Sequence, residues 1–207
     1  MHPAIKGRIH YDEKYVEVLK GFGYDLNAID SITKFVLAHL FVDKRTKKNC
    51  EKFLGQIKTN CYPQILERYL SEKHKKVEDR KLFEFVCDGF ANYKTAFDKL
   101  FRRTAKLKFG VPIACKKYGL EHNNNYAERY NGKLEDRIKT IRGGFGSFEG
   151  AELFMNLRRV IHNFVKSNQQ LQGKTPAEMA DIKLKLERNK LLSLIEYCAK
   201  FRRYHVY

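Results

Sequence analysis

Apolar and polar residues alternate along the first part of the chain, as in strands that bury one face. This alternation predicts a strand over residues 8–19, and Gly21-Phe22-Gly23 predicts a hairpin turn after it. A second strand is expected over residues 24–29. The turn residues Asp30 and Ser31 then lead into a third strand over residues 34–42. The pattern indicates three antiparallel strands in meander order.

After the three predicted strands, apolar residues recur at helical spacing. Residues 46–60 place Phe53, Leu54 and Ile57 on one face, and this helix is expected to end before Pro63. A second helical pattern surrounds Ile65, Leu66 and Tyr69, and it ends in a polar loop that reaches Arg80. The first of these helices is amphipathic and is expected to pack on the sheet.

The middle of the chain predicts two further strands. The apolar run 82–87 reads as a buried strand that Asp88-Gly89 ends, and a helix is predicted over residues 92–101. After a basic segment, residues 111–115 are expected to form the fifth strand. Strands followed by alternating helices and strands predict an α/β fold, with one mixed five-stranded sheet and helices on both faces.

Three asparagines, Asn123 to Asn125, open the next predicted helix, because asparagine is a favoured N-cap. The helix is expected to run to Arg142 and to end at Gly143-Gly144. Asn124, Glu128 and Asn131 share one face of it, so a carboxylate is presented between amides. The alternative is an ordinary solvated helix of mixed charge.

The C-terminal part is predicted to be helical. A long helix is expected over residues 147–169, and Thr175-Pro176-Ala177-Glu178 predicts a capping box before a last, basic helix over residues 187–202. We expect residues 1–145 to form the core and residues 146–207 to form helices that pack on it and extend it. The predicted core face of the long helix consists of Phe148, Leu153, Phe154, Leu157, Ile161 and Phe164.

The composition predicts a polyanionic partner. Lys and Arg number 41 against 24 Asp and Glu, which gives a formal net charge of +17, and neutralisation of phosphates drives binding to nucleic acids. An anionic membrane surface is less favoured, because no apolar run approaches the length of a spanning helix, and no small-molecule substrate is expected. The five cysteines contain no C-x-x-C pair, which predicts reduced thiols in a cytoplasmic protein and disfavours zinc.

Three acidic residues stand where they could converge: Asp12 in the first strand, Asp88 at the end of a central strand, and Glu128 on a helix. Singly, each has an ordinary explanation, such as an exposed strand position or a turn pair. Together they suit phosphodiester chemistry, in which clustered carboxylates hold two divalent cations about 3.5–4 Å apart. An oxygen-ligated ion, Mg²⁺ or Mn²⁺, is the expected cofactor.

A family resemblance rests on four segments in order: IHYDEKYVEV, FVCDGFANY, HNNNYAERYNGKLEDRIKTIRGGF and QLQGKTPAEMADI. They resemble the catalytic domain of DDE transposases of prokaryotic insertion sequences, which are kin to retroviral integrases with a ribonuclease-H-like fold. The likeness covers about residues 3–182, and Asp88 and Glu128 are 40 positions apart, within the family's usual range. By this resemblance Asp12, Asp88 and Glu128 form the catalytic, metal-binding triad, supported by Glu13, Asn124 and Asn131.

The resemblance implies an enzyme that cleaves the ends of a DNA element and transfers them to target DNA, as a homo-oligomer in the prokaryotic nucleoid. The alternatives are a ribonuclease-H-type nuclease, or a truncated or domesticated remnant that binds DNA without cleaving it. Related enzymes often carry a basic residue two helical turns after the catalytic Glu, where this chain has Glu135. The residues expected to contact DNA are Arg102, Arg103, Lys106, Lys108, Arg129, Lys133, Arg137 and Arg142.

Overall fold

A computed structural model describes residues 2–19, 21–110, 125–141 and 144–204. Its five-stranded sheet has the order β3-β2-β1-β4-β5. The first three strands pair antiparallel, and β4 and β5 continue the sheet in parallel with β1. The predicted mixed five-stranded sheet is therefore confirmed. The strands are β1 (Ile9–Val18), β2 (Gly21–Asp30), β3 (Val36–Val42), β4 (Glu84–Cys87) and β5 (Lys106–Phe109).

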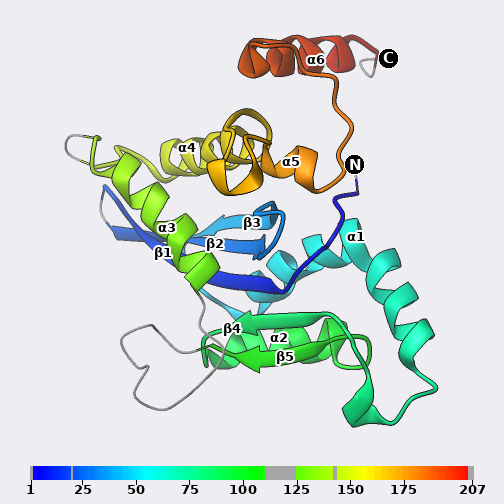
Figure 1. The fold of residues 1–207 in the computed structure, drawn as a ribbon. Helices are drawn as coiled ribbons and strands as arrows, with labels where there is room; N and C mark the ends of the chain where they lie inside the picture. The colour runs from blue at the N-terminus through cyan, green and yellow to red at the C-terminus, as the bar shows by residue number, and fades with distance from the viewer. Residues whose placement is uncertain (1, 20, 111–124, 142–143, 205–207) are drawn as a thin grey trace.

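Helices cover both faces of the sheet (Figure 1). Helices α1 (Lys47–Glu72) and α2 (Ala91–Phe101) pack on one face over a core that includes Tyr11 and Phe53. Helices α3 (Asn125–Ile138) and α4 (Phe148–Val160) cover the other face, over a second core. The remaining helical segments are η1 (Val77–Asp79), η3 (Ile161–Val165), η4 (Gln169–Leu171), α5 (Pro176–Met179) and α6 (Lys190–Tyr204).

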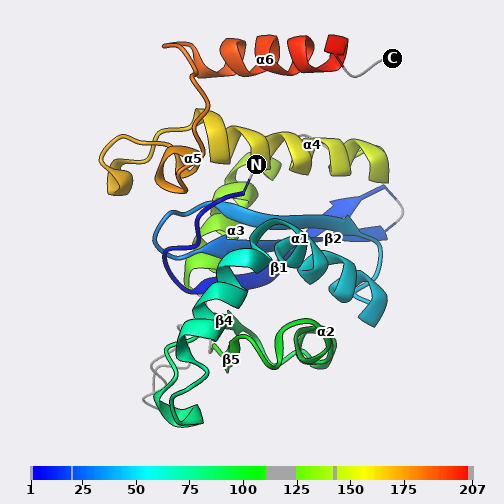
Figure 2. The same cartoon turned by 90° about the vertical axis from the view of Figure 1, so that its right-hand side faces the viewer.

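The C-terminal helix α6 lies apart from the sheet and approaches the rest of the chain at η3 (Figure 2). Before it, α5 begins at the predicted capping box: the Thr175 side chain accepts from the backbone N–H of Glu178, and the Glu178 carboxylate accepts from the backbone N–H of Thr175. Among the described residues, no helix combines the length and apolarity needed to cross a membrane.

The predicted turn at Gly21-Phe22-Gly23 is wrong, because these residues are the start of β2 and pair with Val16 to Val18 of β1. Gly23 is required there by packing. A Cβ atom at this position would collide with the ring of Phe41 on β3. The turn at Asp30 and Ser31 is confirmed.

Asp30 organises that turn and the segment before β1. Its buried Oδ1 accepts hydrogen bonds from the backbone N–H groups of Ile32 at 3.0 Å and Thr33 at 2.6 Å. Its Oδ2 accepts from the N–H groups of Lys6 at 3.1 Å and Gly7 at 2.7 Å. One carboxylate thus joins the β2–β3 turn to the entrance of β1.

The prediction that a helix ends before Pro63 is wrong, since α1 continues through Pro63 to Glu72. The buried face of α1 continues without a break past the proline, from Ile57 through Cys61 to Ile65. Proline removes one backbone hydrogen bond, whereas each fully buried large aliphatic side chain contributes about 2 kcal/mol. Burial therefore keeps the helix continuous.

The fifth strand lies earlier than predicted. Strand β5 is formed by Lys106–Phe109, at the end of the basic segment that precedes the predicted strand, and it pairs in parallel with β4. Residues 111–115 lie outside the described part of the chain. An edge strand buries few side chains, so the run KLKF can form one although it lacks an apolar core pattern.

Helix α3 ends at Ile138, four residues before the predicted Arg142, which lies outside the described residues. Helix α4 is shorter than predicted too, because a π-helical turn, η3, follows Val160. Within η3, the buried amide of Asn163 accepts a 2.9 Å hydrogen bond from the N–H of Val36 and donates a 3.1 Å bond to its C=O. This amide ties the end of α4 to β3.

The predicted core face of α4 is partly wrong. Leu153 and Leu157 are 70% and 52% exposed, and Ala151 and Met155 are the fully buried positions. Phe148 and Phe154 pack partly buried against the second core, as expected.

Candidate metal centre and nucleic-acid interface

Three carboxylates meet beside β1. Each of Asp12, Glu13 and Asp88 offers an oxygen atom, and these atoms lie within 4.8 Å of one another. Strand β4 pairs with β1 in parallel at Ile9 and His10. The same register brings Asp88, the residue after β4, level with Asp12. The structure thus brings together two of the three predicted catalytic residues, and it adds Glu13, which was expected in a supporting role.

Glu13 is held from the α1 and α2 side of the sheet. The Arg45 guanidinium donates to its Oε1, and the Tyr93 hydroxyl donates to Oε2 at 2.9 Å. Burial raises the pKa of Glu13, and the Tyr93 hydrogen bond and the Arg45 charge oppose that rise. Two donors therefore fix the Glu13 carboxylate, and both come from residues that the sequence pattern did not single out.

Asp12 is held from the opposite, α3 side. The Nδ2 of Asn131 donates a 3.2 Å hydrogen bond to its Oδ2, so the predicted neighbour of the site does lie beside it. Burial and the charge of Glu13 raise the pKa of Asp12 to about 7, with smaller contributions from Asp88 and Glu128. The neighbouring carboxylates repel one another, and a divalent cation would relieve that repulsion.

The donor set fits a hard cation. Carboxylate oxygens are the ligands that Mg²⁺ and Mn²⁺ prefer. An ion between Asp12 and Asp88 would neutralise the charges that raise the pKa of Asp12.

Glu128 lies in the first turn of α3 and is partly buried. Its charge acts on Asp12, but it does not belong to the group of three carboxylates within 4.8 Å. The other predicted residue on this face, Asn124, lies outside the described residues. Further along α3, Glu135 forms ion pairs with Lys14 of β1 and with Lys139, which gives it a structural role.

A cluster of cations borders α3. Arg129, Lys133 and Arg137 are exposed on this helix. Burial lowers the pKa of Lys133, and the charges of Lys166 and Arg129 lower it further. Burial likewise lowers the pKa of Lys34, where Arg129 and Lys133 act in the same direction against Asp30. Such mutual repulsion marks a surface suited to an anionic partner.

The surface beside α3 is concave as well as basic. Lys133 and Arg137 line a cavity of about 150 Å³ together with Arg158 and Lys166, which follow much later in the chain. The sequence analysis identified Lys133 and Arg137 from their spacing along α3. It missed Arg158 and Lys166, because their contribution depends on how the end of α4 and η3 pack against α3.

The other predicted DNA-contacting residues lie elsewhere. Arg102 and Arg103 are exposed after α2, and Lys106 and Lys108 lie on the edge strand β5. Lys108 pairs with Glu84 at 2.8 Å, so part of its charge is neutralised within the sheet. Arg142 lies outside the described residues.

The cysteines of the described residues are free: Cys50, Cys61 and Cys87 are buried and Cys198 is exposed. Burial raises the pKa of Cys87 to about 12, although this thiol is one residue from Asp88. It therefore stays protonated and is a poor metal ligand.

No protein-family model matches the chain, and no curated protein matches it by sequence. A solved chain from the cryo-EM structure of a simian T-cell lymphotropic virus intasome in complex with PP2A regulatory subunit B56 gamma is similar in fold. Its TM-score is 0.53 with 10% sequence identity, over 91% of this chain and 61% of that chain. The present chain thus spans about three fifths of that longer one.

Two catalytic core domains are also similar. The HTLV-2 integrase catalytic core domain in complex with magnesium has a TM-score of 0.49 and 11% identity, over 87% of this chain and 98% of that one. The catalytic core domain of BIV integrase has a TM-score of 0.44 and 16% identity, over 82% and 91%. With the strand order of the sheet, the likeness to the intasome chain shows that this protein has the predicted ribonuclease-H-like fold.

Proposed function

We propose that this protein is a metal-dependent polynucleotidyl transferase that cleaves and joins DNA strands, as transposases and integrases do. The observation that carries the proposal is the meeting of Asp12, Glu13 and Asp88 within 4.8 Å on a ribonuclease-H-like sheet. Such a fold hosts several chemistries, so the function has to be argued from the site.

In this proposal Asp12 and Asp88 bind Mg²⁺ or Mn²⁺, and Glu128 completes a two-ion site from α3. Bound metal ions would activate the attacking oxygen and stabilise the leaving oxygen at the scissile phosphate. Asn131 orients Asp12 through its 3.2 Å hydrogen bond. Glu13, held by Arg45 and Tyr93, keeps a further negative charge beside the ions.

The reaction has two steps. Water attacks the phosphorus at the end of a DNA element, and the P–O3′ bond breaks to leave a 3′-hydroxyl. That hydroxyl then attacks a phosphodiester of target DNA, so a new P–O bond forms as the target's own P–O3′ bond breaks. A ribonuclease-H-type nuclease on the same fold would stop after the first step.

The basic surface beside α3 supports DNA as the substrate. Carboxylates alone would repel a polyanion, and Arg129, Lys133 and Arg137 on the carboxylate-bearing helix offset that repulsion. Each phosphate neutralised in a duplex adds about −0.9 to the slope of log K against log salt, so binding should weaken steeply with salt. We also propose that a homo-oligomer assembles on the DNA, because two element ends have to be joined to one target.

The test is cleavage and strand transfer of labelled duplex with Mg²⁺, comparing the wild type with Asp88→Asn. We expect the variant to lose both reactions and to bind DNA equally or more tightly, because it loses a metal ligand and a charge that repels phosphate. Asp98→Asn is the matched control, since Asp98 is exposed on α2 and makes no ion pair among the described residues.

Three outcomes have distinct meanings. Cleavage without strand transfer by the wild type would favour the nuclease alternative. Cleavage that survives Asp88→Asn would exclude the carboxylate cluster as the catalytic site. Loss of DNA affinity together with loss of the fold in Asp88→Asn would assign Asp88 a structural role.

A further inference from the structure

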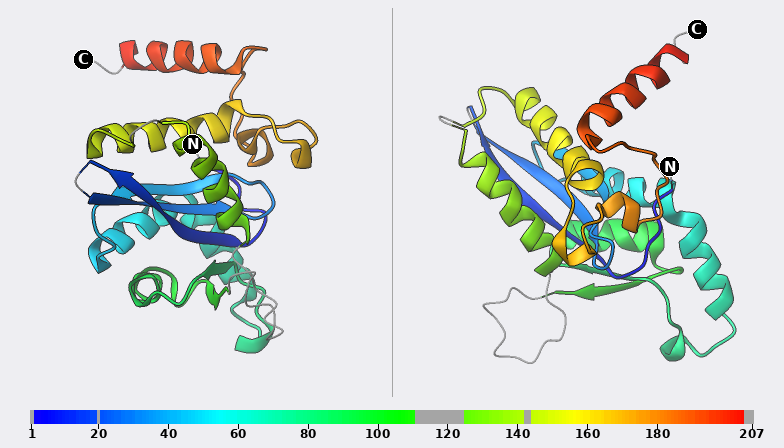
Figure 3. Two further views of the ribbon diagram at one scale, coloured as in Figure 1. Left: turned by 90° about the vertical axis from the view of Figure 1, so that its left-hand side faces the viewer. Right: turned by 45° about the horizontal axis from the view of Figure 1, so that its top comes forward.

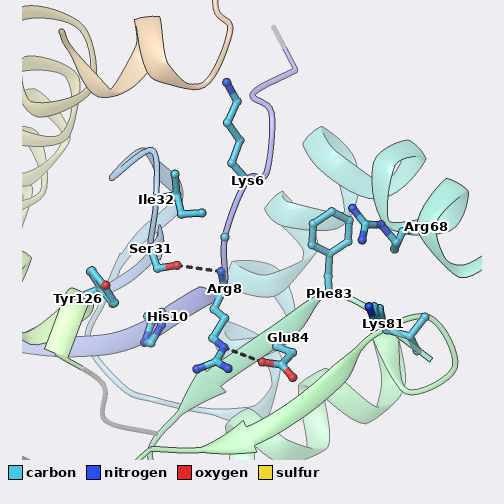
Figure 4. Close-up of a pocket in the computed structure, with 12 residues that line it drawn as sticks. Lys6, Arg8, His10, Ser31, Ile32, Arg68, Lys81, Phe83, Glu84 and Tyr126 are labelled. Atoms are coloured by element: carbon cyan, nitrogen blue, oxygen red, sulfur yellow. Dashed lines mark hydrogen bonds and ion pairs between the residues drawn. The ribbon is translucent and has the colours of Figure 1, made fainter. Parts of the chain in front are cut away.

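A second concave site lies at the start of β1 and β4. It is a cavity of about 590 Å³, between residues 6–10 and 31–32 on one side and Arg68 and residues 81–84 on the other (Figure 4). Tyr126, near the start of α3, closes it beside His10. No motif identified from the sequence assigns a ligand to this cavity.

Four cations line the cavity. Lys6 pairs with Asp181 at 2.9 Å, and the Nε of Arg8 pairs with Glu84 at 2.7 Å. The other two, Arg68 on α1 and Lys81 before β4, are exposed and form no ion pair with any described residue. The cavity therefore carries a surplus of positive charge and suits an anionic ligand.

Aromatic rings stand beside these charges. The guanidinium of Arg68 lies over the ring of Phe83, with its central carbon 5.3 Å from the ring centroid. Across the cavity, the rings of His10 and Tyr126 meet edge to face with centroids 4.9 Å apart. A site for an inorganic anion does not require aromatic side chains. Cationic side chains combined with aromatic rings are typical of sites that bind single-stranded nucleic acid.

The cavity adjoins the carboxylate cluster. His10 and Asp12 point to the same face of β1, where Tyr126 contacts the first and Asn131 the second. His10, at the near end of the cavity, is two residues or about 7 Å from Asp12, and Phe83, at its far end, is five residues or about 17 Å before Asp88. A single strand whose phosphate lies at Asp12 therefore reaches the far end of the cavity within a few nucleotides.

We propose that this cavity binds a nucleotide of a single-stranded segment of the substrate, a few nucleotides from the phosphate at the carboxylate cluster. Its base takes the place of the Arg68 guanidinium over Phe83, and its phosphates are held by Arg68 and Lys81. The inference rests on the proposed function, because the segment is a strand that has been separated from its duplex for cleavage or joining.

The experiment measures binding of the full chain to a fluorescent oligothymidylate and to an abasic oligomer of the same length, without divalent metal. The double variant Arg68→Ala/Lys81→Ala should weaken binding to both oligomers. It should also lower the salt slope by about 0.7 for each phosphate that the cavity no longer neutralises. Phe83→Leu should weaken oligothymidylate binding about fivefold or more, because the base has no ring to stack on, and leave abasic binding unchanged.

Lys52→Ala/Lys94→Ala is the charge-matched control, because both lysines are exposed in the N-terminal halves of α1 and α2 and do not line the cavity. It should retain the wild-type slope. Phe83 is partly buried, so the unfolding midpoint of Phe83→Leu is measured alongside its binding. If that midpoint falls, the binding of Phe83→Leu and of the wild type is compared without denaturant, at a temperature at which both are fully folded.

Wild-type binding by the double variant would overturn the proposal. So would a loss for both oligomers in the double variant with no effect of Phe83→Leu, because that result describes a site for anions and not for nucleotides. The readout involves no cleavage, so it is separate from the Asp88→Asn test. A chain that binds oligothymidylate in this cavity but never cleaves DNA would refute the proposed function and leave the nucleotide site standing.

Discussion

Asp12 should destabilise the folded protein when no metal is bound, and Asp12→Asn should therefore be more stable than the wild type. Burial and the charge of Glu13 raise the pKa of Asp12 from its ordinary value of 3.8 to about 7. The folded state therefore holds a proton that the unfolded state releases as pH rises through this interval. By linkage, the wild type loses stability between those two pH values, and the loss is complete above about pH 7.

The size of the effect follows from the same pKa change. Each pH unit between the two pKa values corresponds to about 1.4 kcal/mol, so the full penalty is at most about 4 kcal/mol. Asn has no charge to lose or gain. The stability advantage of Asp12→Asn should thus grow from about 2 kcal/mol at about pH 5 to about 4 kcal/mol at about pH 8.

The assay is urea unfolding with a chelator at both pH values, followed by the same measurement with Mg²⁺. Metal should stabilise the wild type, by about 2.7 kcal/mol at a concentration a hundredfold above its Kd, and should leave Asp12→Asn unchanged. Asp98→Asn, on the exposed side of α2, serves as control. If Asp12→Asn gains no stability at the higher pH and Mg²⁺ stabilises both proteins equally, the carboxylates do not form a cation site.

Two further predictions concern packing. Gly23→Ala should destabilise the fold by about 2 kcal/mol, because its Cβ would collide with the Phe41 ring. The control is Gly21→Ala, whose Cβ would meet nothing within 4 Å and which should cost much less. Urea unfolding midpoints compare the two variants. Asn163→Ala should cost about 3 kcal/mol, because it leaves the buried N–H and C=O of Val36 without their partner. A cost below about 1 kcal/mol in urea unfolding would mean that water replaces the amide.

The strands that carry Asp12 and Asp88 follow from patterns that are local in the sequence. Alternation identified β1, and a short apolar run ending in Asp-Gly identified β4. These patterns left open which strand lies beside β1, and the expectation that Asp88 joins Asp12 in one site came from the family resemblance. By contrast, the role of Glu13 depends on Arg45 and Tyr93, which belong to elements with no shared local pattern.

The wrong predictions come from choices that tertiary packing decides. Pro63 is a strong local signal for the end of a helix, and the buried side chains around it outweigh that signal. On α4, one apolar stripe contains Leu153 and Leu157 and another contains Ala151 and Met155. Helical spacing allows either stripe to face the sheet. The stripe with Ala151 and Met155 does so, and Phe148 and Phe154 pack partly buried beside it.

The place of the carboxylates can be understood from the topology of the sheet. The chain builds β1, β2 and β3 outward in one direction and then returns to add β4 and β5 on the other side of β1. The strand order therefore reverses between β1 and β4, and open α/β sheets bind ligands at such a switch point, outside the carboxyl ends of their strands. Beyond His10 no described residue of β4 pairs with β1, so this edge of β1 is open. Figure 3 shows β4 and β5, in green, on the side of β1 away from β2 and β3. Asp12 and Glu13 point to opposite faces of the sheet, yet both can turn toward Asp88 across that open edge. An acidic pair at Ile9 and His10, where β4 pairs with β1, would be separated by the sheet itself, which is why consecutive acids can approach Asp88 together only past His10.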